Sequence, residues 1–331
     1  MAIAVITGAG AGVGRAVADM YASKGYDVAL IARSRERLEV AAEAARGHGV
    51  RALVLPTDMA DADAVEQAAD TVERELGPID LWVNDAMATI FAPVHEIKPE
   101  EFRRATEVTY LGTVYGTMAA LKRMRVRDAG TIINIGSALA YRAIPLQSAY
   151  CGAKYAIRGF TDSLRCELLH EGSAIYLTMV HLPAVNTPQF DWARNRMGRQ
   201  PQPVPPAFQP EVIARAVWFA TTHRRREVWV GWPTVKAILA NKIAPGLIDH
   251  YLGLKGYQAQ LTDTQVPKEF EGNLFQPGEG HATAHGRFDQ IAKSHSWEMW
   301  TDRHGQAIAL AGMALGMLGI GAVLRGVLPR R

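Results

Sequence analysis

Cysteine is almost absent from this sequence, which holds only Cys151 and Cys166 among 331 residues. Two cysteines exclude the disulfide framework of a small secreted domain and favour a reducing compartment. The chain also lacks a strong charge imbalance: its formal net charge is +3, which gives no reason to expect a nucleic-acid partner. No apolar leader precedes the strand-like residues 3–7, so we expect a cytoplasmic catalytic domain.

Metal-binding patterns are equally scarce. His281 and His285 stand four residues apart, but they lie in a glycine-rich stretch without the carboxylate and histidine partners that a metal ion requires. His181 ends an apolar run, where a buried core histidine is the plainer interpretation. Cys151 has no neighbouring base that would make it a thiolate nucleophile. The sequence therefore predicts no metal site and no cysteine chemistry.

Long uncharged runs are missing from most of the chain, with one exception near its C-terminal end. Residues 307–324 carry no charged side chain over 18 positions, which is the lower limit for crossing a bilayer. The GxxxG spacing of Gly312 and Gly316 permits close helix packing. We therefore expect membrane contact through residues 306–325. A buried helix rich in glycine and alanine, or a hairpin lying at the membrane interface, are the alternatives.

What the chain does contain is a regular alternation of apolar strand-like runs and helical runs. This alternation predicts an α/β fold, in which a doubly wound parallel sheet of about seven strands carries helices on both faces. The domain spans residues 1–232. The expected strands are 2–7, 27–32, 50–55, 79–84, 131–137, 174–181 and 227–231. The expected helices are 13–25, 35–48, 62–76, 99–127, 148–171 and one that opens at residue 210.

The alternation breaks at residues 182–210, where seven prolines stand among Phe190, Trp192 and other large apolar side chains. A loop of this length is usually functional, and its aromatic residues favour a folded lid over the substrate. Residues 233–305 form an extension that we expect to be mostly helical, with a polar glycine-rich part before the apolar tail.

A glycine-rich turn follows the first strand, with the sequence TGAGAGVG over residues 7–14. Glycines allow a tight turn and close approach to a pyrophosphate, and the helix that follows presents its N-terminus. The candidate cofactor-binding residues here are Thr7, Gly8, Gly12, Val13 and Gly14. A purely structural turn is the alternative.

The end of the second strand decides between the two nicotinamide dinucleotides. An acidic residue there would hold the ribose 2′-hydroxyl of NAD, but the sequence has Arg33 and Ser34. The planar guanidinium of Arg33 suits a 2′-phosphate. We therefore expect NADP(H) to be preferred over NAD(H); a merely basic helix start is the alternative.

Three residues form the candidate catalytic set: Ser137 at the end of a β-branched strand, Tyr150, and Lys154 four residues later. On a helix this spacing places Tyr150 and Lys154 on one face. A free tyrosine has a pKa near 10, and a neighbouring ammonium is expected to lower it towards the range of a useful acid or base. Ser137 would orient and polarise a substrate carbonyl.

With the glycine turn and the YCGAK motif at residues 150–154, the sequence resembles the short-chain dehydrogenase/reductase family, over roughly residues 1–231. The resemblance implies a Rossmann-type fold of about 250 residues, here with a C-terminal extension. It implies that Lys154 also binds the nicotinamide ribose, together with Tyr150. It further implies cofactor contacts at Asp58, Asn84 and Thr187. A homodimer through the helices at 99–127 and 148–171 is also implied.

The chain departs from the family pattern at three places, one of which is after the sixth strand, where Pro183-Ala184 stands for the usual Pro-Gly. After the fourth strand the sequence is Asn84-Asp85-Ala86-Met87, in which Met87 replaces a glycine. Thr109 stands where the family usually has a catalytic asparagine, so a catalytic role for Thr109 is in doubt.

These observations predict an NADP-dependent oxidoreductase that interconverts a carbonyl and an alcohol, with a lipophilic small-molecule substrate suggested by the aromatic lid and the apolar tail. The departures from the family pattern keep open a non-catalytic or regulatory dinucleotide-binding protein. An epimerase or dehydratase acting on nucleotide sugars is a third reading, although such relatives usually space their glycines differently.

Overall fold

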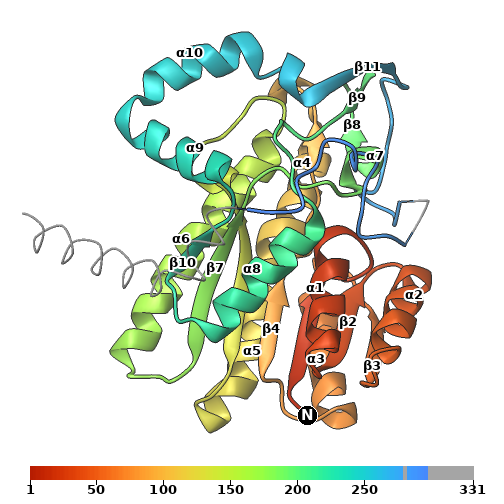
Figure 1. The fold of residues 1–331 in the computed structure, drawn as a ribbon, viewed down its shortest axis with the longest axis vertical. Coiled ribbons are helices and arrows are strands. Elements are labelled where there is room, and N and C mark those ends of the chain that lie inside the picture. Colours follow the sequence, from red (N-terminus) through yellow and green to blue (C-terminus); the bar gives the residue numbers. More distant parts are fainter. Residues whose placement is uncertain (279–281, 297–331) are drawn as a thin grey trace, which may run out of the picture.

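The computed structural model describes residues 1–278 and 282–296. Its centre is a parallel sheet of seven strands in the order β10-β7-β6-β4-β1-β2-β3 (Figure 1). The predicted doubly wound Rossmann-type sheet is therefore confirmed. The strands are β1 (Ile3–Thr7), β2 (Asp27–Ala32), β3 (Ala52–Pro56), β4 (Leu81–Asn84), β6 (Thr131–Ser137), β7 (Tyr176–Leu182) and β10 (Glu227–Trp229).

Helices cover both faces of this sheet, and each face has its own apolar core. One core packs α1 (Gly12–Ser23), α2 (Arg35–Arg46) and α8 (Pro210–Thr222) against the sheet. The other packs α3 (Ala62–Glu75), α5 (Gly112–Arg127) and α6 (Ser148–His170) against the opposite face. The strands are uncharged over most of their length because both of their faces are buried.

The helix expected at 99–127 is not a single regular helix. It consists of α4 (Pro99–Thr106), a π-helical turn η2 (Glu107–Leu111) and α5. A Cβ atom at Gly112 would lie 2.8 Å from the Cβ of Met59, and one at Gly116 would lie 2.3 Å from Oδ1 of Asn84. Glycine at these positions lets the helix approach the sheet closely, next to the place where the π turn disturbs its register.

The chain crosses over between β1 and β4, where the strand order reverses. In open α/β sheets a ligand binds at the carboxyl ends of the strands beside such a crossover. Figure 1 shows the N-terminus at the opposite edge of the sheet and the lid and extension above the carboxyl edge. The fold therefore places the candidate site under these two segments.

The lid is folded, as its aromatic residues predicted. It contains α7 (Gln189–Trp192), β8 (Arg194–Asn195) and β9 (Arg199–Pro201), and β8 pairs with the short strand β5 (Ile90–Phe91). Glu101 of α4 anchors it through buried ion pairs with Arg194, at 2.7 Å, and Arg196, at 3.0 Å. Three 3-10 turns complete the described elements: η1 (Val94–Glu96), η3 (Ala138–Ala140) and η4 (Gln258–Gln260).

The extension begins as two helices, α9 (Trp232–Ile243) and α10 (Pro245–Lys255). Strand β11 (Leu261–Gln265) follows and pairs antiparallel with β9 of the lid. The described residues after β11 are irregular, so the helical character predicted for the extension holds only to Lys255. Proline and glycine recur in this later part and interrupt regular structure.

Within residues 1–278 and 282–296, no helix is long and apolar enough to cross a membrane. The predicted contact segment at 306–325 lies outside the described residues.

Candidate active site

Three glycines in the turn between β1 and α1, Gly8, Gly12 and Gly14, could not carry a side chain without strain. Gly8 and Gly12 have φ angles of +73° and +58°, in the left-handed region that favours glycine. A Cβ atom at Gly14 would lie 2.4 Å from the carbonyl oxygen of Gly8. A bare backbone at the start of a helix is the cradle that a dinucleotide pyrophosphate requires, so the residues present fit this cofactor.

Thr7 supports the turn from below instead of facing the cavity. Its hydroxyl accepts hydrogen bonds from the backbone N–H groups of Asp85, at 3.0 Å, and Ala86, at 3.1 Å. It thereby ties the end of β1 to the loop after β4. Gly8, Gly12 and Val13 line a cavity that also contains the candidate catalytic residues.

Arg33 lies at the end of β2 and lines the same cavity, but its guanidinium is engaged by the extension. Nη1 donates to the carbonyl oxygens of Leu274, at 3.3 Å, and Phe275, at 3.0 Å, and Nη2 donates to Asn273, at 2.5 Å. Ser34 begins α2, where its hydroxyl accepts a hydrogen bond from the N–H of Arg37. Sequence reasoning missed the partners of Arg33, because they lie about 240 positions away and no local pattern links them.

Asp58 lines the cavity after β3, beside Arg33. It forms an ion pair with Arg104 of α4 and accepts the N–H of Ala60 at 3.0 Å. Burial is the largest single influence and opposes the ionisation of Asp58. The hydrogen bonds from Arg104 and Ala60, together with the charges of Arg104 and Arg33, outweigh it and hold the pKa of the carboxyl below its ordinary value. Arg37 lies 4.1 Å from the ring centre of Trp192 in the lid. The adenosine end of the expected cofactor site thus combines several arginines with one carboxylate.

Ser137, Tyr150 and Lys154 are brought together, as predicted. All three line the cavity; Ser137 ends β6, and the other two lie on α6. Nζ of Lys154 donates to the carbonyl oxygen of Ile135 at 2.6 Å and lies 5.5 Å from the ring centre of Tyr150. Ser137 and Tyr150 are hydrogen-bonded to each other.

The net lowering that we expected for the pKa of Tyr150 does not occur in this arrangement. Burial raises the pKa of the Tyr150 phenol above its ordinary value, and the hydrogen bond with Ser137 offsets this only in part. Burial also lowers the pKa of the Lys154 ammonium, against the raising effect of Asp85. The reason is that a buried site disfavours the charged form of each group more strongly than the neighbouring groups favour it.

Asp85 is a cavity residue that the sequence indicated only as a departure from a pattern. It accepts the N–H of Gly14, and it interacts electrostatically with Lys154. Burial raises the pKa of its carboxyl. The site therefore contains a buried carboxyl group that interacts with the buried ammonium of Lys154.

Besides Thr7 and Gly14, two more predicted site residues are not among those that line the cavity. The hydroxyl of Thr109 is fully buried in the π turn, where it accepts from the N–H of Ala88 at 2.9 Å and donates to the Ala88 carbonyl at 3.0 Å. Asn84 is also buried; it accepts from Trp82 Nε1 at 2.8 Å and donates to Asn134 Oδ1 at 2.9 Å. Both side chains hold backbone and core together. Thr187, by contrast, lines the cavity.

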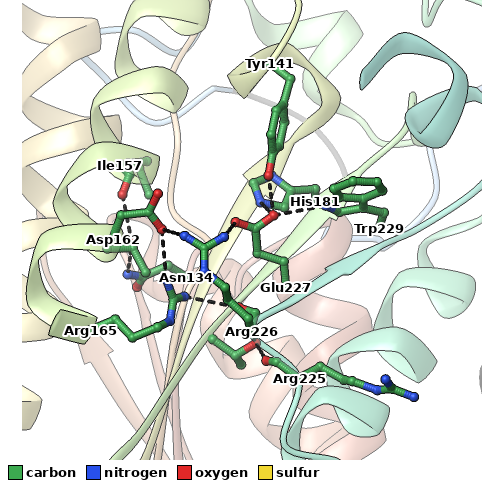
Figure 2. A network of polar contacts seen from close by, with 12 residues as sticks. Asn134, Tyr141, Ile157, Asp162, Arg165, His181, Arg225, Arg226, Glu227 and Trp229 are labelled. Carbon is green, nitrogen blue, oxygen red and sulfur yellow. Dashed lines mark hydrogen bonds and ion pairs between the residues drawn. The ribbon is translucent and has the colours of Figure 1, made fainter. Parts of the chain in front are cut away.

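His181 and Glu227 belong to a network of polar contacts (Figure 2). Nδ1 of His181 lies 3.2 Å from the Ser137 carbonyl oxygen, and Nε2 lies 3.6 Å from Glu227. The same carboxylate accepts hydrogen bonds from Tyr141 and from Trp229, the latter at 3.0 Å. Burial lowers the pKa of His181 below its ordinary value, so the imidazole is neutral at pH 7. His181 is a buried core residue, as predicted, but it contacts the backbone of a candidate catalytic residue.

One cavity of about 450 Å³ joins these groups. It runs from the glycine turn and Arg33 past Ser137 and Tyr150 to the lid and the first turn of α9. Part of the extension borders it as well, since the N–H of Gly12 donates to the carbonyl oxygen of Thr283 at 3.0 Å. The cofactor and substrate regions are therefore continuous.

No group of three or more metal-binding side chains occurs in the part of the chain that the structure describes. His285 instead contacts Glu211 at 2.6 Å and Asp289 at 3.2 Å. His281 lies outside the described residues.

Comparisons with known proteins identify the family of this chain. Residues 2–197 match the family model for short chain dehydrogenases. The protein named Uncharacterized oxidoreductase YxnA from Bacillus subtilis (strain 168) is 29% identical over 325 residues, covering 98% of this chain and 90% of that protein. A fatty acyl-CoA reductase from Acinetobacter baylyi is 30% identical over 228 residues, covering 68% of this chain and 75% of that protein.

Two solved structures share the fold. An alcohol dehydrogenase from the archaeon Thermococcus sibiricus, complexed with 5-hydroxy-NADP, superposes with a TM-score of 0.61 at 28% identity, covering 70% of this chain and 96% of that chain. A metagenomic short-chain oxidoreductase in complex with NADP has a TM-score of 0.60 at 26% identity, covering 69% of this chain and 96% of that chain. The family match and the shared fold show that this protein belongs to the short-chain dehydrogenase family and is an NAD(P)-dependent dehydrogenase or reductase.

Proposed function

We propose that this protein is an NADP-dependent oxidoreductase that interconverts a lipophilic carbonyl compound and its alcohol, with Ser137, Tyr150 and Lys154 as catalytic residues. One observation carries the proposal: these three side chains line the same cavity as the glycine turn and Arg33. A hydride donor held by the turn and a proton donor on α6 would thus face one substrate.

In the direction of reduction, a nicotinamide dinucleotide held at the glycine turn would supply the hydride for the carbonyl carbon. The hydroxyl of Ser137 donates a hydrogen bond to the carbonyl oxygen, and Tyr150 passes its phenolic proton to the alkoxide as that oxygen gains charge. Burial keeps Tyr150 protonated at neutral pH, which suits a proton donor. The ammonium of Lys154, 5.5 Å from the tyrosine ring, stabilises the phenolate that remains.

The preference for NADP rests on the charge around the adenosine end of the site. Arg33 and Arg37 line the cavity, and Arg104 lies beside them through its ion pair with Asp58. Guanidinium groups bind phosphate oxygens through paired N–H donors. The two similar structures contain NADP or 5-hydroxy-NADP, which supports the same preference in this chain.

A lipophilic substrate is supported by the apolar residues in the wall of the cavity. Leu182, Val185, Phe190 and Val204 are among them. One similar protein is a fatty acyl-CoA reductase, so an apolar carbonyl substrate has a precedent among relatives. A substrate preference for small polar sugars or acids would contradict this part of the proposal.

The oligomeric state and the membrane contact of this protein are also proposals. We expect a homodimer through α5 and α6, where Met118 and Tyr155 are exposed; sedimentation would show the mass. Membrane contact through residues 306–325 is proposed on the sequence alone. Truncation after residue 303 should then release the chain to the soluble fraction.

The deciding experiment is NADPH consumption with a panel of lipophilic ketones and aldehydes. Tyr150→Phe should lower turnover by several orders of magnitude and leave NADPH binding largely unchanged. Near-normal turnover in Tyr150→Phe would reject the mechanism. NADPH binding without turnover on any compound of the panel would favour a non-catalytic dinucleotide-binding protein.

A further inference from the structure

The two helices of the extension leave apolar stripes uncovered. On α9, Leu239 and Ile243 are 44% and 83% exposed, and on α10, Leu247 and Leu254 are 72% and 79% exposed, with Tyr251 between them. No residue of α10 is buried. Spacings of three and four residues place such side chains on one face of each helix. A helix of a soluble domain normally turns this face towards the core, so these stripes need another partner.

This pair of helices lies beside the candidate site. Figure 1 shows α9 and α10 above the carboxyl edge of the sheet, at the end of the molecule opposite the N-terminus. Pro233, Thr234 and Ala237 of α9 line the cavity, while other residues of the same helix carry the exposed stripe. Arg142 anchors the pair from below by donating to Asn241 at 3.1 Å and to Asp249 at 2.5 Å.

The charge of the two helices is one-sided. Lys236, Lys242 and Lys255 are exposed, and Asp249, the one carboxylate within residues 232–255, is paired with Arg142. Trp232 is half-exposed at the start of α9. Apolar side chains flanked by lysine, with tryptophan and tyrosine among them, are typical of helices that lie in the headgroup region of a membrane.

We propose that α9 and α10 dock on the surface of an anionic lipid bilayer. The apolar stripes enter the boundary between headgroups and acyl chains, and the lysines contact the lipid phosphates. A second copy of this chain fits less well, because a two-fold contact through this face brings lysines towards lysines. In the docked orientation the cavity opens next to the membrane. Delivery of substrate from the bilayer rests on the proposed function, but docking does not.

A position-specific probe separates this contact from any contact made by residues 306–325. In the full chain carrying Cys166→Ser, which removes the exposed native thiol, Leu247→Cys is labelled with an environment-sensitive fluorophore. Vesicles of phosphatidylcholine and phosphatidylglycerol should shift its emission to the blue, less so at high salt. Val40→Cys on α2, labelled in the same way, should not respond. An unchanged signal at position 247, whether or not the chain sediments with the vesicles, overturns the proposal.

Substitution provides the second measurement. Ile243→Ser with Leu247→Ser should lower vesicle affinity roughly tenfold or more, because large apolar side chains no longer enter the lipid. The matched control is Val40→Ser, since Val40 is 42% exposed on another helix; it should leave affinity unchanged. If the double variant and Val40→Ser bind vesicles with equal affinity, the docking proposal is contradicted. It is also contradicted if the fluorescence at position 247 changes with protein concentration in the absence of lipid, because that result identifies a second copy of the chain as the partner. Both readouts use binding without turnover, so they stand even if the proposed reaction fails.

Discussion

The imidazole Nδ1 of His181 lies 3.2 Å from the carbonyl oxygen of Ser137, so a buried histidine of β7 holds the backbone of the candidate catalytic residue that ends β6. Burial lowers the pKa of His181 in the folded chain. Below about pH 6.5 the unfolded chain therefore protonates this histidine more readily than the folded chain does. Stability is therefore lost as the pH falls below that value. His181→Asn keeps an N–H donor and does not titrate, so its stability should depend less on pH in this range.

Urea unfolding at several pH values measures this difference. His48→Asn is the control, because His48 is an exposed histidine that pairs with Asp19 on the surface; the acid-induced loss of stability should persist in it. The same acid dependence in His181→Asn as in the parent chain would rule out His181 as its source.

The interaction of Asp85 with Lys154 predicts a change in the pH profile. When ionised, Asp85 raises the pKa of the buried ammonium. Asp85→Asn removes this effect, so Lys154 should lose its proton at a lower pH. The alkaline limb of kcat/KM for carbonyl reduction should then move to lower pH by roughly one unit. An unshifted alkaline limb, in a variant that still binds NADPH, would contradict this coupling.

Arg33 should distinguish the two dinucleotides. Loss of its guanidinium removes charge-assisted hydrogen bonds to a 2′-phosphate, so Arg33→Ala should weaken NADPH roughly 10- to 100-fold and NADH much less. Binding titrations with both cofactors provide the measurement. The control is Arg35→Ala, because Arg35 is mostly exposed at the start of α2. Equal losses for NADPH and NADH in Arg33→Ala would refute the proposed role.

Gly14 should tolerate no side chain. Its Cβ would lie 2.4 Å from the backbone oxygen of Gly8, which cannot move without opening the turn. Gly14→Ala should therefore destabilise the fold by about 2–4 kcal/mol and abolish dinucleotide binding. Gly10→Ala in the same turn is the matched control, since its Cβ would make only ordinary contacts at 3.4 and 3.6 Å. Denaturant unfolding of both variants measures the contrast, and equal stabilities would contradict the steric argument.

The sequence predicted those parts of the molecule that depend on local pattern. The buried strands alternate with helices along the chain, and Tyr150 and Lys154 stand four residues apart on one helix, so both the sheet and the candidate catalytic group followed from spacing. The sequence did not predict that Asn84 and Thr109 are buried away from the cavity. The indole of Trp82 binds Asn84 in the core, and the π turn directs Thr109 into it. Contacts between distant segments, such as Arg33 with Asn273 or Asp58 with Arg104, leave no trace in local sequence.

The hydrogen bond from the Gly12 N–H to Thr283 has a consequence for the binding of the dinucleotide. A pyrophosphate arriving at the glycine turn would compete with a carbonyl of the same chain for that donor. Binding would then replace the hydrogen bond to Thr283 with one to the pyrophosphate instead of adding a new bond. The apparent affinity would be lower when fewer molecules have the Gly12 N–H free. We expect the extension to weaken the apparent affinity for the dinucleotide by this competition.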